Sequence, residues 1–361
     1  MDAERTLPDR AVAAAAEFGL DWAGIAGVAP PPHLARFPEW MSEGRAGEMT
    51  YLARRADDGR YLREDIAAAW PWARAVLCAA VVYRPVLSGP DQAKAAGASR
   101  QSKALISKYA LGDDYHTVLR PRLTAWAERV NQLAGRPTAR FAVTVDTAPL
   151  VERVAAAQAG LGWQGKNTCL IHPRRGSFFF IGVVLTEIEL APGTPLPDRC
   201  GSCTRCIDAC PTEALTPYAM DARRCLAYLN IELRGAIPEE FRVPMGANVF
   251  GCDICQDVCP WNRRAPATTD PAFQPREGLA APDLAALAAL DEDAWRALFR
   301  NSAVKRAKFP AFRRNLAVAM GNSGDPAYVH LLTRWAHNSD DATLAEHARW
   351  ALDRLESHHH S

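Results

Sequence analysis

The first half of the chain alternates between short apolar runs and longer segments in which apolar residues recur every three or four positions. The run AVLCAAVVY at 75–83 is apolar throughout, which predicts a strand buried on both faces. The other predicted elements are strands at 20–28, 139–145 and 177–187, and helices at 8–18, 33–57 (one or two), 113–133 and 150–159. The polar stretch 88–100 is predicted to be a loop. This alternation predicts an α/β domain over residues 1–190.

The pattern changes after a proline-rich linker at 191–198. Beyond about residue 271, successive short segments have the apolar spacing of helices, at 281–300, 302–308, 310–321, 326–336 and 341–355. Short helices joined by turns are typical of helical-hairpin repeats, so residues 276–356 are predicted to form an all-α, HEAT-like repeat. The histidine-containing end at 357–361 is interpreted as a tag remnant without a part in function.

Between these parts, the chain contains two closely spaced cysteine runs. The first reads C-x2-C-x2-C-x3-C-P at 200–211, and the second repeats it up to Pro260 with Val249 in place of the first cysteine. Cys225 lies between the runs and supplies the missing thiolate, which gives eight ligands for two clusters. In two-cluster ferredoxins the fourth cysteine of each run binds the other cluster. The first thiol set is therefore predicted to be Cys200, Cys203, Cys206 and Cys259, and the second Cys210, Cys225, Cys252 and Cys255.

Two structural zinc sites are the alternative, since four thiolates also bind zinc. Zinc ribbons use paired C-x2-C motifs and have no use for a third cysteine two residues on, followed by C-P. The spacing therefore favours two 4Fe–4S clusters in a ferredoxin-like α+β domain over residues 191–275. Two adjacent clusters conduct single electrons, which implies an electron acceptor elsewhere in the protein.

Length and composition indicate two or three globular domains, because the chain has 361 residues, 48% of them hydrophobic and 23% charged. No apolar run reaches the roughly 18 residues of a membrane span, and the N-terminus lacks a signal-peptide pattern. Only Cys78 and Cys169 remain outside the two thiol sets, so no disulfide framework is indicated. We therefore expect a cytoplasmic protein that is not bound to a membrane.

The net charge of +1 excludes a polycation, but the charge is unevenly distributed. Between Asp293 and Asp325 the chain has no acidic residue. The basic stretch in this interval consists of Arg296, Arg300, Lys305, Arg306, Lys308, Arg313 and Arg314. Such a stretch fits either a phosphate-binding surface or a solvated helix face, and the pattern alone leaves both open.

From the residues alone, few side chains in 1–190 indicate a catalytic or ligand-binding role. Asp146 follows a predicted strand, where α/β sheets present ligand-binding groups, but an aspartate there also serves as an N-cap for the next helix. The glycine-rich stretch 160–167 matches neither GxGxxG nor a P-loop. It fits a close approach to a flat ligand, with Lys166 toward an anionic group, or an ordinary turn. Surface or core positions are predicted for Arg63, Tyr109, Tyr115 and His116.

Several longer motifs follow one another in a fixed order. They are KYALGDDYH at 108–116, VDTAP at 145–149, GLGWQGKNT at 160–168, the two cysteine runs, YLNIELRG at 228–235 and FRRN at 312–315. In these motifs, and over nearly its whole length, the chain closely resembles epoxyqueuosine reductase. Members of that family are cobalamin-dependent enzymes with two 4Fe–4S clusters. They reduce the epoxide of epoxyqueuosine at the wobble position of the tRNA anticodon, which is the last step of queuosine synthesis.

The resemblance implies a nitroreductase-like cobalamin domain, a ferredoxin-like cluster domain and C-terminal HEAT-like helices. It assigns Asp146 as the proton donor beside the cofactor, and the basic stretch as the tRNA-binding surface. It also implies a monomer that receives electrons from an external donor of flavodoxin or ferredoxin type. The chain departs from the family at Ala69-Trp-Pro-Trp72, where a Leu-Pro-Gly turn is usual, and this affects the path around Arg63. Cobalamin contacts are expected at Arg63, Asp146, Leu170, Ile181 and Arg234.

Two other functions compete with this one. A cobalamin and iron–sulfur reductive dehalogenase has similar cofactors, but those proteins usually carry an export signal and need no nucleic-acid surface. A non-catalytic electron-transfer module, with a ferredoxin fused to helical repeats, leaves the domain at 1–190 without a role. Bound corrinoid would favour either enzyme, and tRNA binding would favour only the reductase.

Overall fold

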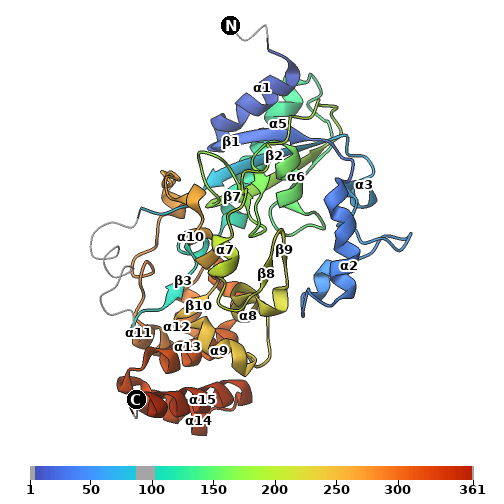
Figure 1. Ribbon diagram of the computed structural model, residues 1–361. Coiled ribbons are helices and arrows are strands. Elements are labelled where there is room, and N and C mark those ends of the chain that lie inside the picture. Colours follow the sequence, from blue (N-terminus) through green and yellow to red (C-terminus); the bar gives the residue numbers. More distant parts are fainter. Residues whose placement is uncertain (1–4, 87–101, 360–361) are drawn as a thin grey trace.

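A four-stranded sheet forms the centre of the N-terminal part (Figure 1). The computed structural model describes residues 5–86 and 102–359, so the predicted loop at 88–100 lies outside the described residues. In order across the sheet, the strands are β1 (Trp22–Ala26), β2 (Ala75–Val82), β7 (Phe179–Thr186) and β4 (Phe141–Thr144). All four predicted strands are thus present. Each neighbouring pair is antiparallel, although alternating helices and strands usually give a parallel sheet.

The two central strands bury side chains on both faces, as the apolar run at 75–83 predicts. Leu77 and Ala79 of β2 face the side covered by α1 (Leu7–Ala14) and α5 (Tyr115–Leu133). Cys78 faces the opposite side, where α6 (Glu152–Gln158) packs. The sheet is therefore a middle layer between helices, visible near the top of Figure 1.

The rest of the N-terminal half consists of short elements. Helices and strands among them are α2 (Phe37–Ser42), α3 (Ile66–Ala69), β3 (Leu105–Ile106), β5 (Trp163–Gln164) and β6 (Leu170–Ile171). Turns of 3-10 helix occur at Ala15–Phe18, Pro32–Arg36, Thr50–Ala53 and Lys108–Ala110. The segment predicted to be one or two helices, 33–57, thus holds one short α-helix flanked by 3-10 turns.

The middle part, with both cysteine runs, is built from very short elements. Its helices and strands are α7 (Arg205–Asp208), α8 (Leu226–Ile231), α9 (Glu239–Met245), α10 (Ile254–Asp257), β8 (Leu215–Thr216), β9 (Ala219–Met220) and β10 (Asn248–Phe250). Its 3-10 turns are Ala222–Arg224, Pro260–Asn262 and Pro271–Phe273. Helices α7 and α10 each begin inside a cysteine run and lie against each other. This brings the two runs together.

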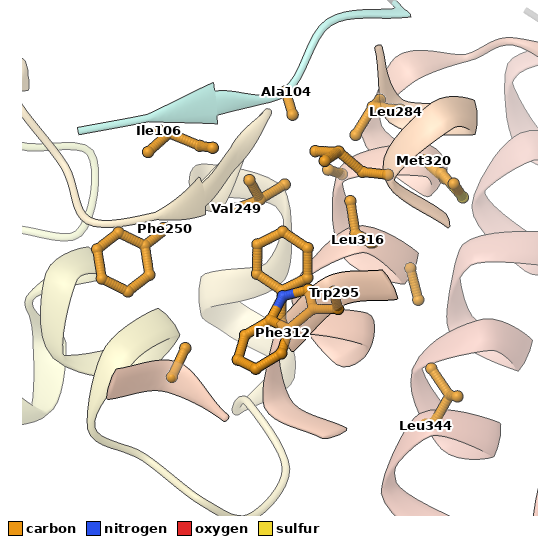
Figure 2. Close-up of a cluster of buried hydrophobic side chains, with 14 of the residues drawn as sticks. Ala104, Ile106, Val249, Phe250, Leu284, Trp295, Phe312, Leu316, Met320 and Leu344 are labelled. Carbon is orange, nitrogen blue, oxygen red and sulfur yellow. The ribbon is translucent and has the colours of Figure 1, made fainter. Parts of the chain in front are cut away.

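Strand β10 pairs in parallel with β3, which comes from the N-terminal half of the chain. Residues around β3 also contribute to the same buried core as the C-terminal helices. Figure 2 shows this shared core, in which Ile106 and Val249 lie beside Leu316 and Trp295. The predicted domain boundaries at 190 and 275 stay predictions, but the segment 102–112 packs with the middle and C-terminal parts.

The C-terminal part consists of helices, which lie at the opposite end of the molecule from the sheet (Figure 1). They are α11 (Leu284–Ala288), α12 (Glu292–Leu298), a 3-10 turn at Ala303–Ala307, α13 (Phe309–Ser323), a 3-10 turn at Pro326–Tyr328, α14 (Val329–Asn338) and α15 (Ala342–His359). The predicted helix at 281–300 is two helices, because the Asp291 side chain accepts a hydrogen bond from the Ala294 amide and starts a new one. Helices α13 and α14 both pack against α15.

One member of the basic stretch is not on the surface. Arg314 is only 1% exposed. Its guanidinium donates hydrogen bonds to the carbonyl oxygens of Leu229 (2.8 Å), Leu233 (3.0 Å) and Gly235. The prediction that Arg314 binds tRNA is therefore wrong. Its position on α13 turns it inward, where it fixes the loop after α8 to the C-terminal helices.

Replacing Arg314 with methionine should destabilise the protein strongly, because methionine fills similar space but leaves the buried carbonyl oxygens without a donor. We expect a loss of about 3 kcal/mol or more in the free energy of unfolding, measured by denaturant titration. The neighbouring Arg313→Met is the matched control and should cost less than about 1 kcal/mol, since Arg313 is partly exposed. Equal stability of the two variants would contradict this role of Arg314.

Candidate active site

Asp146 lies in the loop between β4 and α6, and its side chain is 68% exposed. Its backbone has φ of +55°, in the left-handed region that costs most residues energy, although aspartate tolerates it better than most. The helix that follows has Val151 at its N-cap and no side-chain hydrogen bond there. The alternative role of Asp146 as a helix cap is therefore wrong. A strained, exposed carboxylate is a common feature of functional sites.

Two side chains from the start of α5 reach the Asp146 carboxylate. The Tyr115 hydroxyl donates a hydrogen bond to Oδ2 over 2.9 Å, and the His116 Nε2 lies 3.9 Å from the same oxygen. Burial, together with the charge of Asp146, raises the pKa of Tyr115 well above its usual value, so the hydroxyl remains a donor. The Tyr115 ring stacks on Phe180 of β7 at 4.5 Å, which fixes its position.

His116 is oriented in turn by Asp114, the N-cap of α5. The Asp114 carboxylate lies 2.6 Å from His116 Nδ1 and accepts a hydrogen bond from its backbone amide over 3.0 Å. Although burial opposes it, these hydrogen bonds lower the pKa of Asp114, so this carboxylate stays ionised. Sequence reasoning missed both Tyr115 and His116. Both residues directly follow Asp114, the N-cap of α5, and so lie in the first turn of that helix. This position is the sequence signal that could have indicated them.

Arg63 holds the Asp146 loop from the opposite side. Its guanidinium donates to the carbonyl oxygens of Ala148 and Tyr51, each over 3.1 Å. The unusual sequence at 69–72 follows the end of α3 and leaves this contact intact. Arg63 is therefore brought to the predicted site, where it supports the loop that carries Asp146.

Leu170 and Ile181 lie on the face of the sheet that carries Cys78. Ile181 is the one position of β7 that is not buried, although β7 is a central strand. Thr168, two residues before Leu170, has φ of +63°, which is rare for a β-branched residue. Contacts of Leu170 and Ile181 with cobalamin stay predictions.

Arg234, by contrast, is engaged by the protein itself. Its guanidinium donates to the carbonyl oxygens of Ile231 (3.1 Å), Ala307 (2.9 Å) and Arg306 (3.1 Å). These contacts tie the middle part to the C-terminal helices. A cobalamin contact of Arg234 stays a prediction.

The glycine-rich stretch 160–167 forms the turn and first strand of the hairpin β5–β6. A Cβ atom at Gly162 would lie 2.6 Å from the Ile171 carbonyl oxygen, so the hairpin itself requires glycine. The Lys166 ammonium donates to the carbonyl oxygens of Gly201 (2.7 Å) and Cys203 (3.1 Å). The turn therefore attaches the sheet to the first cysteine run, and these contacts account for Lys166 without an anionic ligand.

The eight predicted cluster cysteines fall into two electrostatic groups. In the first thiol set, Cys206 is influenced by Cys200 and Cys203, and Cys259 by Cys200 and Cys206. In the second set, Cys252 is influenced by Cys225 and Cys210, and Cys255 most strongly by Cys169 and then by Cys252 and Cys225. Cys169, which belongs to neither predicted set, also acts on Cys259 of the first. This grouping agrees with the exchange of the fourth cysteine between runs. The assignment of each ligand stays a prediction.

The chemistry of these thiols fits metal clusters. Burial, with smaller contributions from neighbouring thiolates, raises the pKa of Cys252 to about 12 and that of Cys259 to about 11. Such groups become thiolates only when a nearby cation compensates the charge, as iron does. Within residues 5–86 and 102–359, no group of three or more His, Cys, Asp or Glu side chains is arranged to hold a single metal ion.

Comparison with known proteins decides the family. A family model described as a 4Fe-4S double cluster binding domain matches residues 199–262, and one described as epoxyqueuosine reductase QueG, DUF1730, matches residues 63–147. An epoxyqueuosine reductase from Xanthomonas campestris pv. campestris is 38% identical over 340 residues, which are 94% of this chain and 93% of the relative. The chain belongs to the epoxyqueuosine reductase family. The resemblance found in the sequence motifs is thereby confirmed.

Solved structures of epoxyqueuosine reductases have the same fold. One from Bacillus subtilis, with its catalytic aspartate loop swung out of the active site, is 26% identical with a TM-score of 0.83, covering 97% of this chain and 90% of that one. Another, with an epoxyqueuosine-modified tRNA-Tyr stem loop, is 26% identical with a TM-score of 0.77, covering 97% and 99%. The likeness extends over the sheet, the middle part and the C-terminal helices together.

Membership of the epoxyqueuosine reductase family makes the chain an oxidoreductase whose cofactors are two 4Fe–4S clusters and cobalamin, as predicted. The alternatives of structural zinc, a reductive dehalogenase and a non-catalytic electron-transfer module are set aside by the same matches. None of the helices in the described residues combines the length and apolar character needed to cross a membrane.

The assignment of Cys225 to the second thiol set predicts a specific loss of iron. Anaerobically reconstituted wild-type protein should hold about eight irons per chain, and Cys225→Ala should retain about four. The control is Cys169→Ser, because Cys169 hydrogen-bonds to Cys255 but is not a predicted ligand. That variant should keep all the iron. Full iron content in Cys225→Ala with loss in Cys169→Ser would show that Cys169 is the eighth ligand instead.

Proposed function

We propose that this chain reduces epoxyqueuosine to queuosine in tRNA, with Asp146 as the proton donor. The observation that carries the proposal is the Asp146 carboxylate, which is exposed, strained and held by the Tyr115 hydroxyl. Two solved relatives support it, since one is described with its catalytic aspartate loop swung out of the active site and another holds an epoxyqueuosine-modified tRNA stem loop. Anaerobic assay on epoxyqueuosine-containing tRNA with a chemical reductant tests it directly.

The chemistry requires an acid at this place. Opening an epoxide leaves an alkoxide, a poor leaving group unless it is protonated as the C–O bond breaks. A positioned carboxylic acid typically contributes about 10²–10⁴-fold to such a step. Asp146 protonates the oxygen, while Tyr115 fixes the carboxylate and Arg63 fixes the loop through Ala148.

Cobalamin and the two clusters supply the electrons for this reduction when bound. The residues that would hold cobalamin are Arg63, Leu170, Ile181 and Arg234, and the two thiol sets would hold the clusters. In this arrangement the enzyme works as a monomer and takes electrons from an external flavodoxin- or ferredoxin-like donor. The proposed division is 1–190 for cobalamin, 191–275 for the clusters and 276–356 for a HEAT-like, tRNA-binding part.

The members of the basic stretch differ in their exposure and in whether a carboxylate pairs with their charge. Arg296 is paired with Glu292 (2.6 Å), and Arg306 makes two hydrogen bonds to Glu232 (2.8 and 2.9 Å). Arg313 is partly exposed and lies over the Trp335 ring at 4.9 Å. Exposed side chains without an ion pair among the described residues are Arg300, Lys305 and Lys308.

These three cations line one open hollow between α12 and α13, together with Arg296 and Phe309. Glu292 and Asp293 also line it, and both lie within 4 Å of Arg296, so the three unpaired cations are the ones free to bind phosphate. Cations spaced around a hollow match the spacing of phosphates along an RNA backbone better than a flat solvated face does. This hollow is the proposed tRNA contact.

Arg306 connects this surface to the active site. Its guanidinium lies 5.4 Å from the centre of the Tyr51 ring, and the Tyr51 carbonyl oxygen binds Arg63. The charge of Asp146 also acts on Arg306. The C-terminal helices and the acid loop therefore adjoin, so a stem held by the helices can place one nucleotide at Asp146.

Asp146→Asn should abolish turnover on epoxyqueuosine-containing tRNA, by about 10²-fold or more, because asparagine keeps the shape but has no proton to give. Cobalamin content and cluster absorbance should be unchanged. The control is Asp57→Asn, an exposed aspartate outside the site, which should retain full activity. Activity near wild type in Asp146→Asn would remove the acid role from this residue.

Reversing Arg300, Lys305 and Lys308 to glutamate should weaken tRNA binding. Because phosphate contacts release counterions, the slope of log affinity against log salt should also become shallower by about 2–3. Binding is measured by filter retention or anisotropy over a salt series, and both cofactors should be retained.

A matched triple reversal on the sheet part, at exposed Arg74, Arg120 and Arg140, changes the net charge equally. It should leave the affinity and the salt slope close to wild type. If both triple variants bind tRNA alike, the hollow is a solvated surface and the contacts lie around the mouth of the cobalamin site.

A further inference from the structure

One aromatic side chain at the edge of the active site is exposed and has no assigned role. Among the phenylalanine, tyrosine and tryptophan side chains of the described residues, only Tyr51 (42%) and Tyr218 (38%) are exposed. The Tyr218 hydroxyl donates a hydrogen bond to Asp198, whereas the Tyr51 hydroxyl has no hydrogen-bond partner within residues 5–86 and 102–359. Tyrosine rings are enriched at binding surfaces, so an open one beside a functional site is a candidate contact for a ligand.

Hydrogen bonds connect Tyr51 to the loop that carries Asp146. One nitrogen of the Arg63 guanidinium donates to the Tyr51 carbonyl oxygen and the other to the Ala148 carbonyl oxygen, each over 3.1 Å. Ala148 lies two residues after Asp146. A single guanidinium therefore fixes the turn at Thr50–Ala53 relative to the Asp146 loop, and the exposed ring lies at the rim of the proposed active site.

Two cations flank the Tyr51 ring without covering it closely. The guanidinium carbons of Arg306 and Arg63 lie 5.4 and 5.8 Å from the ring centre. By contrast, the Arg55 guanidinium carbon lies 3.8 Å from the centre of the Tyr61 ring, which is only 8% exposed. The larger distances and the exposure of Tyr51 leave part of its ring accessible to another flat group, with positive charge nearby.

An accessible aromatic ring beside cations is suited to single-stranded nucleic acid. Every base has a flat face that stacks on such a ring, and the adjoining phosphates are attracted to the cations. Arg306 belongs to the basic stretch, and its neighbour Lys305 lines the proposed tRNA hollow. Tyr51 therefore lies between the hollow and Asp146, on the path of a strand that reaches from one to the other.

The proposed reaction gives such a ring a task. When one nucleotide leaves a loop and enters an active site, it no longer stacks on its neighbours, and this loss costs free energy. An aromatic side chain at the rim replaces the lost stacking for the neighbouring base. It does so whatever that base is, because stacking depends little on sequence.

We propose that Tyr51 is the stacking platform for a base next to the modified nucleotide of the tRNA anticodon. The ring holds this neighbouring base at the rim while the target nucleotide reaches Asp146. The role rests on the proposed function, because it assumes that a tRNA nucleotide enters this site. Tyr51 contacts no reacting atom and is a positioning residue for the substrate.

Cobalamin is the competing occupant of this surface, since its corrin ring is also flat and Arg63 is a predicted cobalamin contact. The position of Arg306 favours the nucleic acid. That arginine comes from the C-terminal part, lies near the Tyr51 ring and is not among the predicted cobalamin contacts. Cobalamin content is therefore measured for every variant.

The first test measures binding of epoxyqueuosine-containing tRNA to the holoenzyme without reductant, by anisotropy over a salt series. Tyr51→Leu should weaken binding by on the order of tenfold, because the stacking surface is lost. The slope of log affinity against log salt should keep its wild-type value, because no cation is removed. Tyr51→Phe keeps the ring and should bind within about twofold of wild type. Tyr218→Leu, the matched control at similar exposure, should bind as wild type does.

A second readout reports on stacking itself. The fluorescent base 2-aminopurine loses emission when it stacks, and it replaces the base directly before or directly after the wobble nucleotide in a tRNA stem loop. At saturating holoenzyme, one of these two positions should be quenched more strongly by wild type and Tyr51→Phe than by Tyr51→Leu. Tyr218→Leu should quench as wild type does.

The outcomes separate the possible failures. Equal affinity and equal quenching in wild type and Tyr51→Leu would overturn the stacking role. Loss of cobalamin from Tyr51→Leu, with quenching unchanged in the molecules that retain it, would assign the ring to the cofactor site instead. A wild-type holoenzyme that binds the tRNA but does not reduce it would overturn the proposed function and leave the stacking comparison intact. Absence of tRNA binding in wild type would overturn both.

Discussion

The middle part depends on the cysteines of its two runs, which are buried or partly buried, and on the 4Fe–4S clusters of this family. The middle part has little else to hold it, because α7 and α10 have four residues each and helices of that length are unstable alone. Contacts from the sheet part support the same segment. Lys166 binds the Gly201 and Cys203 carbonyl oxygens, and the Asn262 amide donates to Ser177 Oγ over 2.9 Å. Metal binding, domain docking and the folding of this segment are therefore a single event.

Electrons and protons enter the proposed site from different parts of the protein. The cysteine sets lie in the middle part, whereas Asp146 and Tyr115 lie in a loop and a helix start beside the sheet. In the proposed function, the C-terminal helices have a third part, which is to hold the tRNA. Arg306 is the residue at which that surface adjoins the acid loop.

A feature of the fold or of the site could be predicted from the sequence where residues close together in the chain determine it. Cysteine spacing is local, so the two thiol sets could be proposed without a structure. The apolar run of β2 predicted its burial, but the antiparallel pairing is set by distant strands and was not predicted. Arg313 and Arg314 are adjacent and identical in type, yet only the structure shows that Arg314 faces inward.

The left-handed backbone at Asp146 has an evolutionary consequence. Glycine adopts φ of +55° at no steric cost, so the residue best suited to this loop on conformational grounds has no carboxyl group. Selection for thermal stability alone would drive this position toward glycine and remove the acid. If Asp146 is the acid, a stabilised variant of the enzyme therefore has to be engineered around this loop, with the aspartate left in place.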